Sequence, residues 1–149
     1  MSAKTGVFPV YDLKFKVSTT GRAESATMAV VKEMESFSVS MDGGVEEWNP
    51  LDQGGWVRRL MTSKGFTISL AGKRNYGDPG NDYVAGLAWK NGRDCDSLFE
   101  IEFPNGDKLT GDCVLNVTTP FGGDSTAVDA LEFDIMSDGK PTYTPAAST

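Results

Sequence analysis

The stretch Ser36-Phe37-Ser38-Val39-Ser40-Met41 alternates serine with apolar side chains at every second position. A period of two places the apolar residues on one side of an extended strand and the serines on the other. The same alternation recurs at residues 13–18, 66–71, 99–103 and 131–135. The 17 glycines and 7 prolines supply the many turns that short strands require. The sequence therefore predicts a mostly β protein.

One segment departs from this pattern and predicts a helix near residues 79–90. Asp78 is a suitable N-cap residue, and Pro79 stands at the first helical position. Gly92 is placed like a C-terminal glycine cap. A helix of about three turns is stable only when it packs on a sheet. We therefore expect about seven short strands in two packed antiparallel sheets, a sandwich or barrel, with one flanking helix.

The length of 149 residues suits a single domain spanning 1–149, within which two segments stand out. The strand around Phe37 is expected to stop at Asp42-Gly43-Gly44. A long polar connection, residues 43–55, then follows, and connections of this length are often functional. The polar stretch 141–149 is expected to be an extended tail that is ordered only where a neighbour holds it.

Trp48 and Leu51 are large apolar residues inside the otherwise polar connection. In one interpretation they pack onto their own domain. In the other they insert into a neighbouring copy, because tryptophan is favoured at the centres of protein interfaces. The residues alone leave both interpretations open.

The composition argues against an enzyme. The chain has no histidine, so the commonest general base is missing and no Ser-His-Asp or Cys-His arrangement can be built. The carboxylate pairs Glu100/Glu102 and Glu132/Asp134 alternate with apolar residues. This pattern is typical of a solvated strand face rather than of a glycosidase cleft. We expect no catalytic residue, no metal site and no cofactor.

The formal net charge of −7 argues against a nucleic-acid clamp and against binding to an anionic membrane. No apolar run is long enough for a membrane span, and the N-terminal residues lack the apolar region of a signal peptide. We expect the protein to be made in the cytoplasm. Cys95 and Cys113 are expected to be reduced there, with a disulfide as the alternative.

Four segments carry a resemblance to a known protein family. They are Phe37-Ser-Val-Ser-Met41 continuing through Glu46-Glu-Trp-Asn-Pro-Leu-Asp-Gln-Gly-Gly-Trp-Val-Arg-Arg59, and residues 66–74, 77–84 and 131–141. In these segments, and over about residues 6–142 as a whole, the chain resembles the major tail protein, or tail tube protein, of long-tailed, siphovirus-type phages of Gram-positive bacteria. The likeness lies in the order of strands, loop and helix.

The resemblance implies a structural virion protein of the phage tail. Copies would form hexameric rings that stack into a hollow tube, through which DNA passes into the host without specific binding. Further partners would be the tape measure, tail tip and terminator proteins. The connection 43–55 would contact an adjacent subunit or ring through Glu46, Glu47, Trp48, Asn49, Leu51, Gln53 and Trp56. The acidic candidates for the lumen are Glu100, Glu102, Glu132 and Asp134.

Two other classes of function follow from the residues. One is a monomeric β-sandwich binding module, for example for carbohydrate, because exposed aromatic side chains can stack on sugars. Such a protein would stay monomeric and bind a glycan. The other is an enzyme of unfamiliar type, which would lose turnover when a single carboxylate is replaced.

Overall fold

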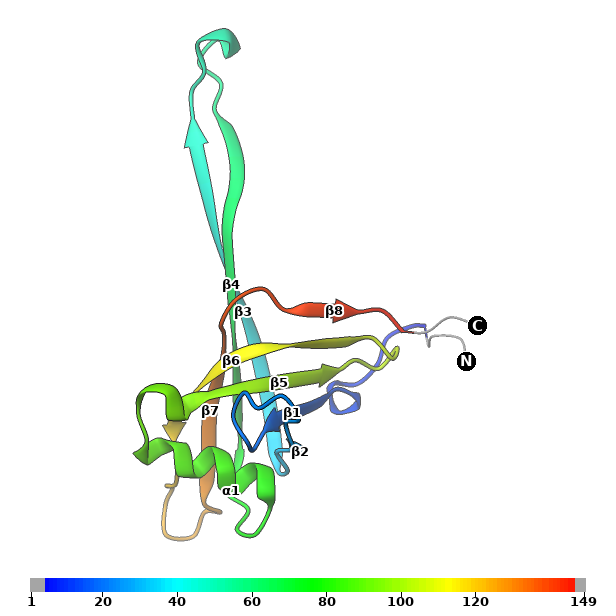
Figure 1. Cartoon of the computed structure of the whole chain (residues 1–149), viewed down its shortest axis with the longest axis vertical. Coiled ribbons are helices and arrows are strands. Elements are labelled where there is room, and N and C mark those ends of the chain that lie inside the picture. Colours follow the sequence, from blue (N-terminus) through cyan, green and yellow to red (C-terminus); the bar gives the residue numbers. More distant parts are fainter. Residues whose placement is uncertain (1–4, 147–149) are drawn as a thin grey trace.

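The computed structural model describes residues 5–146 and contains one α-helix and eight strands in that part of the chain (Figure 1). The strands are β1 (Lys14–Ser18), β2 (Met28–Val30), β3 (Met34–Trp48), β4 (Arg58–Lys73), β5 (Asp96–Glu102), β6 (Lys108–Thr119), β7 (Ala130–Ser137) and β8 (Thr142–Thr144). The helices are α1 (Pro79–Gly86) and the short 3-10 turns η1 (Val10–Asp12), η2 (Leu51–Gln53), η3 (Leu87–Trp89) and η4 (Gly92–Cys95).

The strands form one antiparallel sheet in the order β2-β1-β5-β6-β7-β4-β3, with β8 paired to β6 outside this order. The long β6 joins two halves of the sheet, because it pairs with β5 along Lys108–Val114 and with β7 along Cys113–Thr119. In Figure 1 the strands of the two halves run in different directions. The mostly β fold with one helix is confirmed, but the two expected layers are parts of one continuous sheet.

The two halves enclose a single apolar core. Phe66 of β4 meets Phe99 of β5 edge to face, with ring centroids 5.7 Å apart. Phe15 of β1 and Phe37 of β3 make a similar contact at 4.6 Å, between strands near opposite ends of the sheet order. Such pairs stabilise a core beyond the area they bury. The buried apolar residues are Val17, Val31, Phe66, Ile68, Leu70, Val84, Ala85, Leu87, Phe99, Ile101, Cys113, Leu115, Leu131, Phe133 and Ile135.

Helix α1 begins where the sequence predicts. The side chain of Asp78 accepts a hydrogen bond from the backbone N–H of Asn81 at 3.0 Å, and Pro79 is the first helical residue. The same carboxylate accepts the backbone N–H of Lys32 at 3.2 Å. One capping side chain therefore satisfies a free N–H of the helix and also fixes the helix to the segment between β2 and β3.

The helix ends earlier than predicted. It stops at Gly86 and continues as the tighter turn η3, in which Leu87 is buried in the core. Gly92 has a positive φ of 63° but begins η4 instead of capping α1, so its predicted role is wrong. No helix of residues 5–146 is long and apolar enough to cross a membrane.

Asn81 is the polar centre of this region and is fully buried. Its amide nitrogen donates to the backbone carbonyl oxygens of Lys32 (3.1 Å) and Lys73 (3.0 Å). Its amide oxygen accepts from the backbone N–H of Asn75 (3.0 Å) and the guanidinium of Arg74 (2.9 Å). One side chain thus connects α1 to the segment before β3 and to the end of β4.

Both cysteines are free thiols. Cys113 lies in the core on β6, where burial raises its pKa to about 12. The sulfur of Cys95 lies 3.6 Å from the backbone carbonyl oxygen of Lys90. The reduced state, rather than the disulfide, is therefore the one present in this structure.

The C-terminal segment is held by its own chain as far as Ala146. Strand β8 pairs with Lys108–Thr110 of β6. The carboxylate of Asp107 accepts hydrogen bonds from the hydroxyl of Tyr143 and from the backbone N–H of Ala146, the latter at 2.6 Å. These bonds, that of Tyr143 first, hold the pKa of Asp107 below its usual value. The prediction that a neighbour is needed to order the tail is wrong for residues 141–146, and residues 147–149 lie outside the described part.

We expect Asn81→Leu to lower the free energy of unfolding by about 3 kcal/mol, because buried backbone groups lose their hydrogen-bond partners. Urea unfolding followed by circular dichroism measures this change. The control is Asn91→Ala, which removes an exposed cap of η4 and should cost about 1 kcal/mol or less. An Asn81→Leu protein as stable as the wild type would contradict the role given to Asn81.

Acid should release the C-terminal segment before it unfolds the core. A carboxylate whose pKa is lower in the folded than in the unfolded state stabilises the folded state. This stabilisation is complete at pH values above the pKa of the unfolded chain, about 3.9. It is lost as the pH falls through the lower pKa of the folded state. Amide hydrogen exchange at Ala146, measured from about pH 6 to about pH 2, should therefore accelerate relative to a core amide such as that of Phe133. Asp107→Asn should weaken this pH dependence, and an Ala146 amide that follows the core at every pH would contradict the assignment.

Candidate assembly interface

The most prominent feature of the molecule is a long hairpin, which we call the arm (residues 42–64). Strands β3 and β4 pair from Met34↔Gly72 out to Trp48↔Arg58, well beyond the rest of the sheet. Figure 1 shows this hairpin projecting from the body, with η2 at its far end. The prediction of a loop at 43–55 is therefore wrong for its first part, because β3 continues to Trp48.

Two local features explain how the strand passes Gly43 and Gly44. Met61 and Ser63 of the opposite strand occupy the space beside them: a Cβ on Gly43 would lie 3.1 Å from Cε of Met61, and one on Gly44 would collide with Oγ of Ser63. The register shifts after Gly44, and the hydroxyl of Thr62 donates to the Gly44 carbonyl oxygen at 3.1 Å. Here glycine marks a bulge and a close approach rather than a strand end.

The seven residues predicted for the interface come together at the far end of the arm. Glu46, Glu47 and Trp48 end β3, Asn49 follows, Leu51 and Gln53 form part of η2, and Trp56 precedes β4. All seven are exposed, Leu51 fully so.

Packing of the tip onto its own domain, the first interpretation for Leu51, is therefore wrong in the single chain. Near the tip, Glu47 and Arg59 form an ion pair, with 2.8 Å between Oε1 of Glu47 and Nε of Arg59. Because both side chains are exposed, this pair adds little stability and leaves the tip available.

The four acidic candidates lie on two separate surfaces. Glu100 and Glu102 are on the outer side of β5, opposite Lys16 and Lys14 of β1 in the sheet register. The Lys16 ammonium lies 3.5 Å from the Glu100 carboxylate, and Lys108 of β6 is opposite Glu102. This surface has mixed charge.

Glu132 and Asp134 lie on the outer side of β7, on what we call the hydroxyl face. Their partners in β4 are Ala71 and Ser69, and Asn116 of β6 is opposite Asp134. The same side of β3 and β4 carries Ser36, Ser38, Ser40 and Thr67. Lysine is present only at its border, where Lys73 pairs with Glu35 at 3.0 Å. The hydroxyl face therefore consists of small polar residues and carries negative charge.

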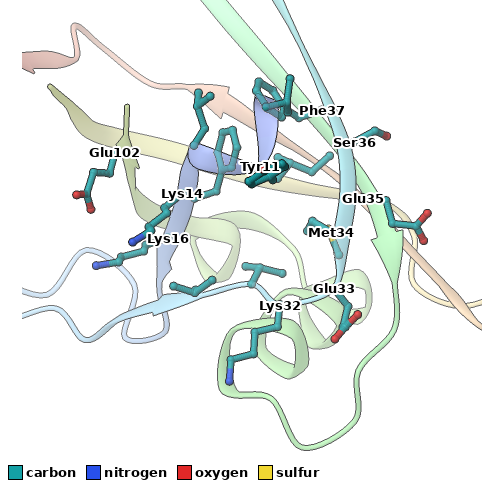
Figure 2. A pocket seen from close by; sticks show the side chains of 16 residues that line it. Tyr11, Lys14, Lys16, Lys32, Glu33, Met34, Glu35, Ser36, Phe37 and Glu102 are labelled. Atoms are coloured by element: carbon teal, nitrogen blue, oxygen red, sulfur yellow. The ribbon is translucent and has the colours of Figure 1, made fainter. Parts of the chain in front are cut away.

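A groove of about 900 Å³ lies where the sheet fails to close, between β1 and β2 on one side and β3 on the other. In Figure 2 the ring of Phe37 lies in the groove and Tyr11 lines it, although Tyr11 is largely exposed, and charged ends such as those of Lys14 and Glu35 point outward. The outer edge of β3 has no strand partner among the described residues. The groove thus offers apolar side chains and free backbone groups, which suit an extended peptide segment.

Sequence reasoning missed an aromatic cluster beside α1. Trp89 and Phe121 have ring centroids 6.3 Å apart, and the guanidinium of Arg74 lies 4.2 Å from the ring centre of Tyr76. Tyr76 donates a hydrogen bond to Asp129 at 3.1 Å, which raises the pKa of its phenol. Trp89 ends η3, whereas Tyr76 and Phe121 lie in two separate loops, so no periodic pattern in the sequence could group them.

Among residues 5–146, no three His, Cys, Asp or Glu side chains gather in a way that could hold a metal ion. What the chain presents is an exposed arm with an apolar tip, an apolar groove and an acidic hydroxyl-rich face.

No known family model matches the chain, and no curated protein matches it. Solved structures do resemble its fold. A chain in the tail of an empty gene transfer agent (GTA) particle, obtained with helical refinement and C6 symmetry, superposes with a TM-score of 0.74 at 17% identity, covering 93% of this chain and 100% of the other. A chain of the virion of a native GTA particle gives 0.71, with the same identity and coverage.

A more distant likeness is to the tube-terminating cap of the anti-feeding prophage. Its TM-score is 0.55 at 15% identity, covering 98% of this chain and 96% of the other. The protein therefore has a fold that is also found in components of phage-like tails and tubes.

Proposed function

We propose that this protein is the subunit of a tail tube, in which copies form hexameric rings that stack into a hollow tube for the passage of DNA. The observation that carries the proposal is the arm, whose exposed apolar tip has no partner among residues 5–146. The fold it shares with chains of a C6-symmetric GTA tail supports the same role. The resemblance of the sequence to major tail proteins favours a phage tail of the long, siphovirus type.

The surfaces suit an assembly that can extend without limit. The arm tip and the apolar groove are different surfaces of one chain, so a contact between them in two copies is heterologous. Heterologous contacts generate rings when the rotation closes and filaments when it does not, and a stacked tube needs both. Tape measure, tail tip and terminator proteins would meet the ends and lumen of such a tube. The subunit itself performs no catalysis and uses no cofactor.

We assign the lumen to the hydroxyl face around Glu132 and Asp134, rather than to the surface around Glu100 and Glu102. DNA must slide without being held, so a lining should lack free cations and should repel phosphate weakly. The hydroxyl face meets this requirement, because its lysine is at the border and is paired with Glu35. On the surface of β5, Lys14 of β1 and Lys108 of β6 both lie opposite Glu102, so this surface has more lysine than that carboxylate can pair and would bind phosphate locally.

A carbohydrate-binding module is the second candidate, and the aromatic cluster favours it. Tyr76, Trp89 and Phe121 are exposed around a hollow of about 330 Å³ that also contains Arg74 and Asp82. Aromatic rings with nearby polar groups are suited to stack on sugars. In a tube, the same Trp, Tyr and Arg side chains would suit contacts between subunits, since these residue types dominate protein interfaces.

Removal of the distal arm should abolish tubes without unfolding the subunit. Replacing residues 46–60 by Asn-Gly would join the Val45–Met61 pair through a two-residue hairpin turn. We expect circular dichroism and thermal unfolding close to the wild type, but no rings or tubes by negative-stain electron microscopy. Tubes of normal form would contradict the role of the arm. A wild-type chain that stays monomeric at high concentration and binds a glycan would favour the second candidate.

Reversal of charge on the lumen face should impair DNA passage rather than assembly. In particles assembled from a Glu132→Lys/Asp134→Lys subunit, we expect normal tubes and reduced DNA delivery per particle, because phosphate is now attracted to the wall. Particle counts by microscopy and delivery counts on recipient cells measure the two separately. The matched control is Glu100→Lys/Glu102→Lys on the other surface. Equal delivery by both variants would contradict the assignment of the lumen.

A further inference from the structure

The shaft, by which we mean the paired segments 39–45 of β3 and 61–68 of β4 that lead from the body into the arm, has one apolar face. Val39, Met41, Gly43 and Val45 stand at every second position of β3, and the residues of β4 opposite Gly43 and Val45 are Lys64 and Met61. The exposed apolar side chains of this face are Val39, Met41, Val45 and Met61. Their exposed fractions are 52%, 65%, 45% and 48%, respectively. The row continues the line of Phe37 in the core, but beyond the body no element of the described part of the chain covers it. Apart from Lys64, this surface is therefore apolar and yet exposed.

The opposite face of the shaft is polar. It carries Ser40, Asp42 and Gly44 on β3, with Ser63 and Thr67 on β4. The two glycine contacts support this division, since Met61 lies beside Gly43 on one face and Ser63 beside Gly44 on the other. In the body, this polar side of β3 and β4 is the hydroxyl face that includes Ser69, Glu132 and Asp134.

The tip differs from the shaft. Beyond the bulge, Leu60 and Trp48 lie on the polar side, while Glu47 and Arg59 continue the apolar row as an ion pair. Leu51 and Trp56 are exposed at the end. Apolar side chains thus surround the tip, whereas the shaft presents them on one side only.

We propose that the apolar face of the shaft packs on a second copy of this chain, while the polar face stays in water and extends the DNA-facing surface from one ring to the next. This inference rests on the proposed tail tube function and assigns a separate role to each face. A two-stranded hairpin has marginal stability in water by itself, so a long arm requires a covering surface on its apolar side. In Figure 1 the arm projects away from its own body, which leaves another molecule to supply that cover.

A second copy fits this surface better than a small ligand or a nucleic acid. The face carries one cation, Lys64 opposite Gly43, and a single lysine among apolar side chains is too little positive charge for a nucleic-acid surface. Its flat, ladder-like form over several residue pairs lacks the concave shape of a small-molecule site. The similar chain of the GTA tail is present in a helical, C6-symmetric arrangement, in which each copy has neighbours along the axis and around it.

Substitutions at two neighbouring positions test the two faces of the shaft at about the same distance from the body. Met41→Asp places a charge on the apolar face, and Ser40→Asp places the same charge on the polar face. Both side chains are exposed in the free subunit, so both variants should remain folded. We expect Met41→Asp to raise the protein concentration required for tube formation at least about tenfold, and Ser40→Asp to leave it near the wild-type value. Light scattering over a dilution series, with electron microscopy, measures this concentration.

A second pair lies farther from the body and avoids a change of charge. Met61→Gln should weaken assembly and Ser63→Gln should not, with equal thermal stability of the two free subunits. The inference would be overturned if the apolar-face variants assembled like the wild type, or if the polar-face variants failed to the same extent. In either case, tubes formed by the wild-type protein would still support the proposed function. A wild-type protein that forms no tubes under these conditions would overturn both.

Discussion

The antiparallel ladder between β3 and β4 is the interaction on which the rest of the structure depends. Its inner part, around Phe37 and Leu70, forms one wall of the core and holds the groove at the unclosed edge of the sheet. Its outer part has no further strand on either side within residues 5–146 and becomes the arm. Because side chains on paired strands alternate together, the ladder carries the division into an apolar side and a polar side from the core to the arm.

This arrangement leaves several surfaces incomplete in the single chain. The sheet does not close between β2 and β3, and the apolar row of the arm extends past the part of the body that could cover it. Open edges and uncovered apolar rows are a liability in a monomer, because they invite association. In a protein that polymerises in a defined geometry, the same features are the sites of contact. The body, by contrast, is closed by side chains such as Asn81 and Asp107, whose bonds tie α1 and β8 to the sheet.

Local chemistry in the sequence predicted much of the body. The alternation around residues 66–71 and 131–135 identified strands and their buried faces, since a half-buried strand requires a period of two. Asp78 and Pro79 marked the start of α1 correctly because capping depends on residues that are close in the chain. The same local reasoning failed at Gly43 and Gly44, where the deciding contacts come from Met61 and Ser63 on the partner strand. Gly92 was misjudged because α1 ends at Gly86 and continues as η3, so Gly92 lies too far along the chain to cap it.

For the candidate site, the sequence determined which residues were unusual, and the tertiary structure decided how they are grouped. Trp48 and Leu51 stood out as apolar residues in polar surroundings, but only the pairing of β3 with β4 places them at the end of an arm. Glu100 and Glu132 were indistinguishable as outward residues of alternating strands, since alternation gives the side of a strand and not its neighbours. The pairing of β5 with the lysines of β1, and of β7 with the hydroxyl groups of β4, separates them. Partners across a sheet are distant in the chain, so the charge of a surface depends on strand order, which a local pattern does not encode.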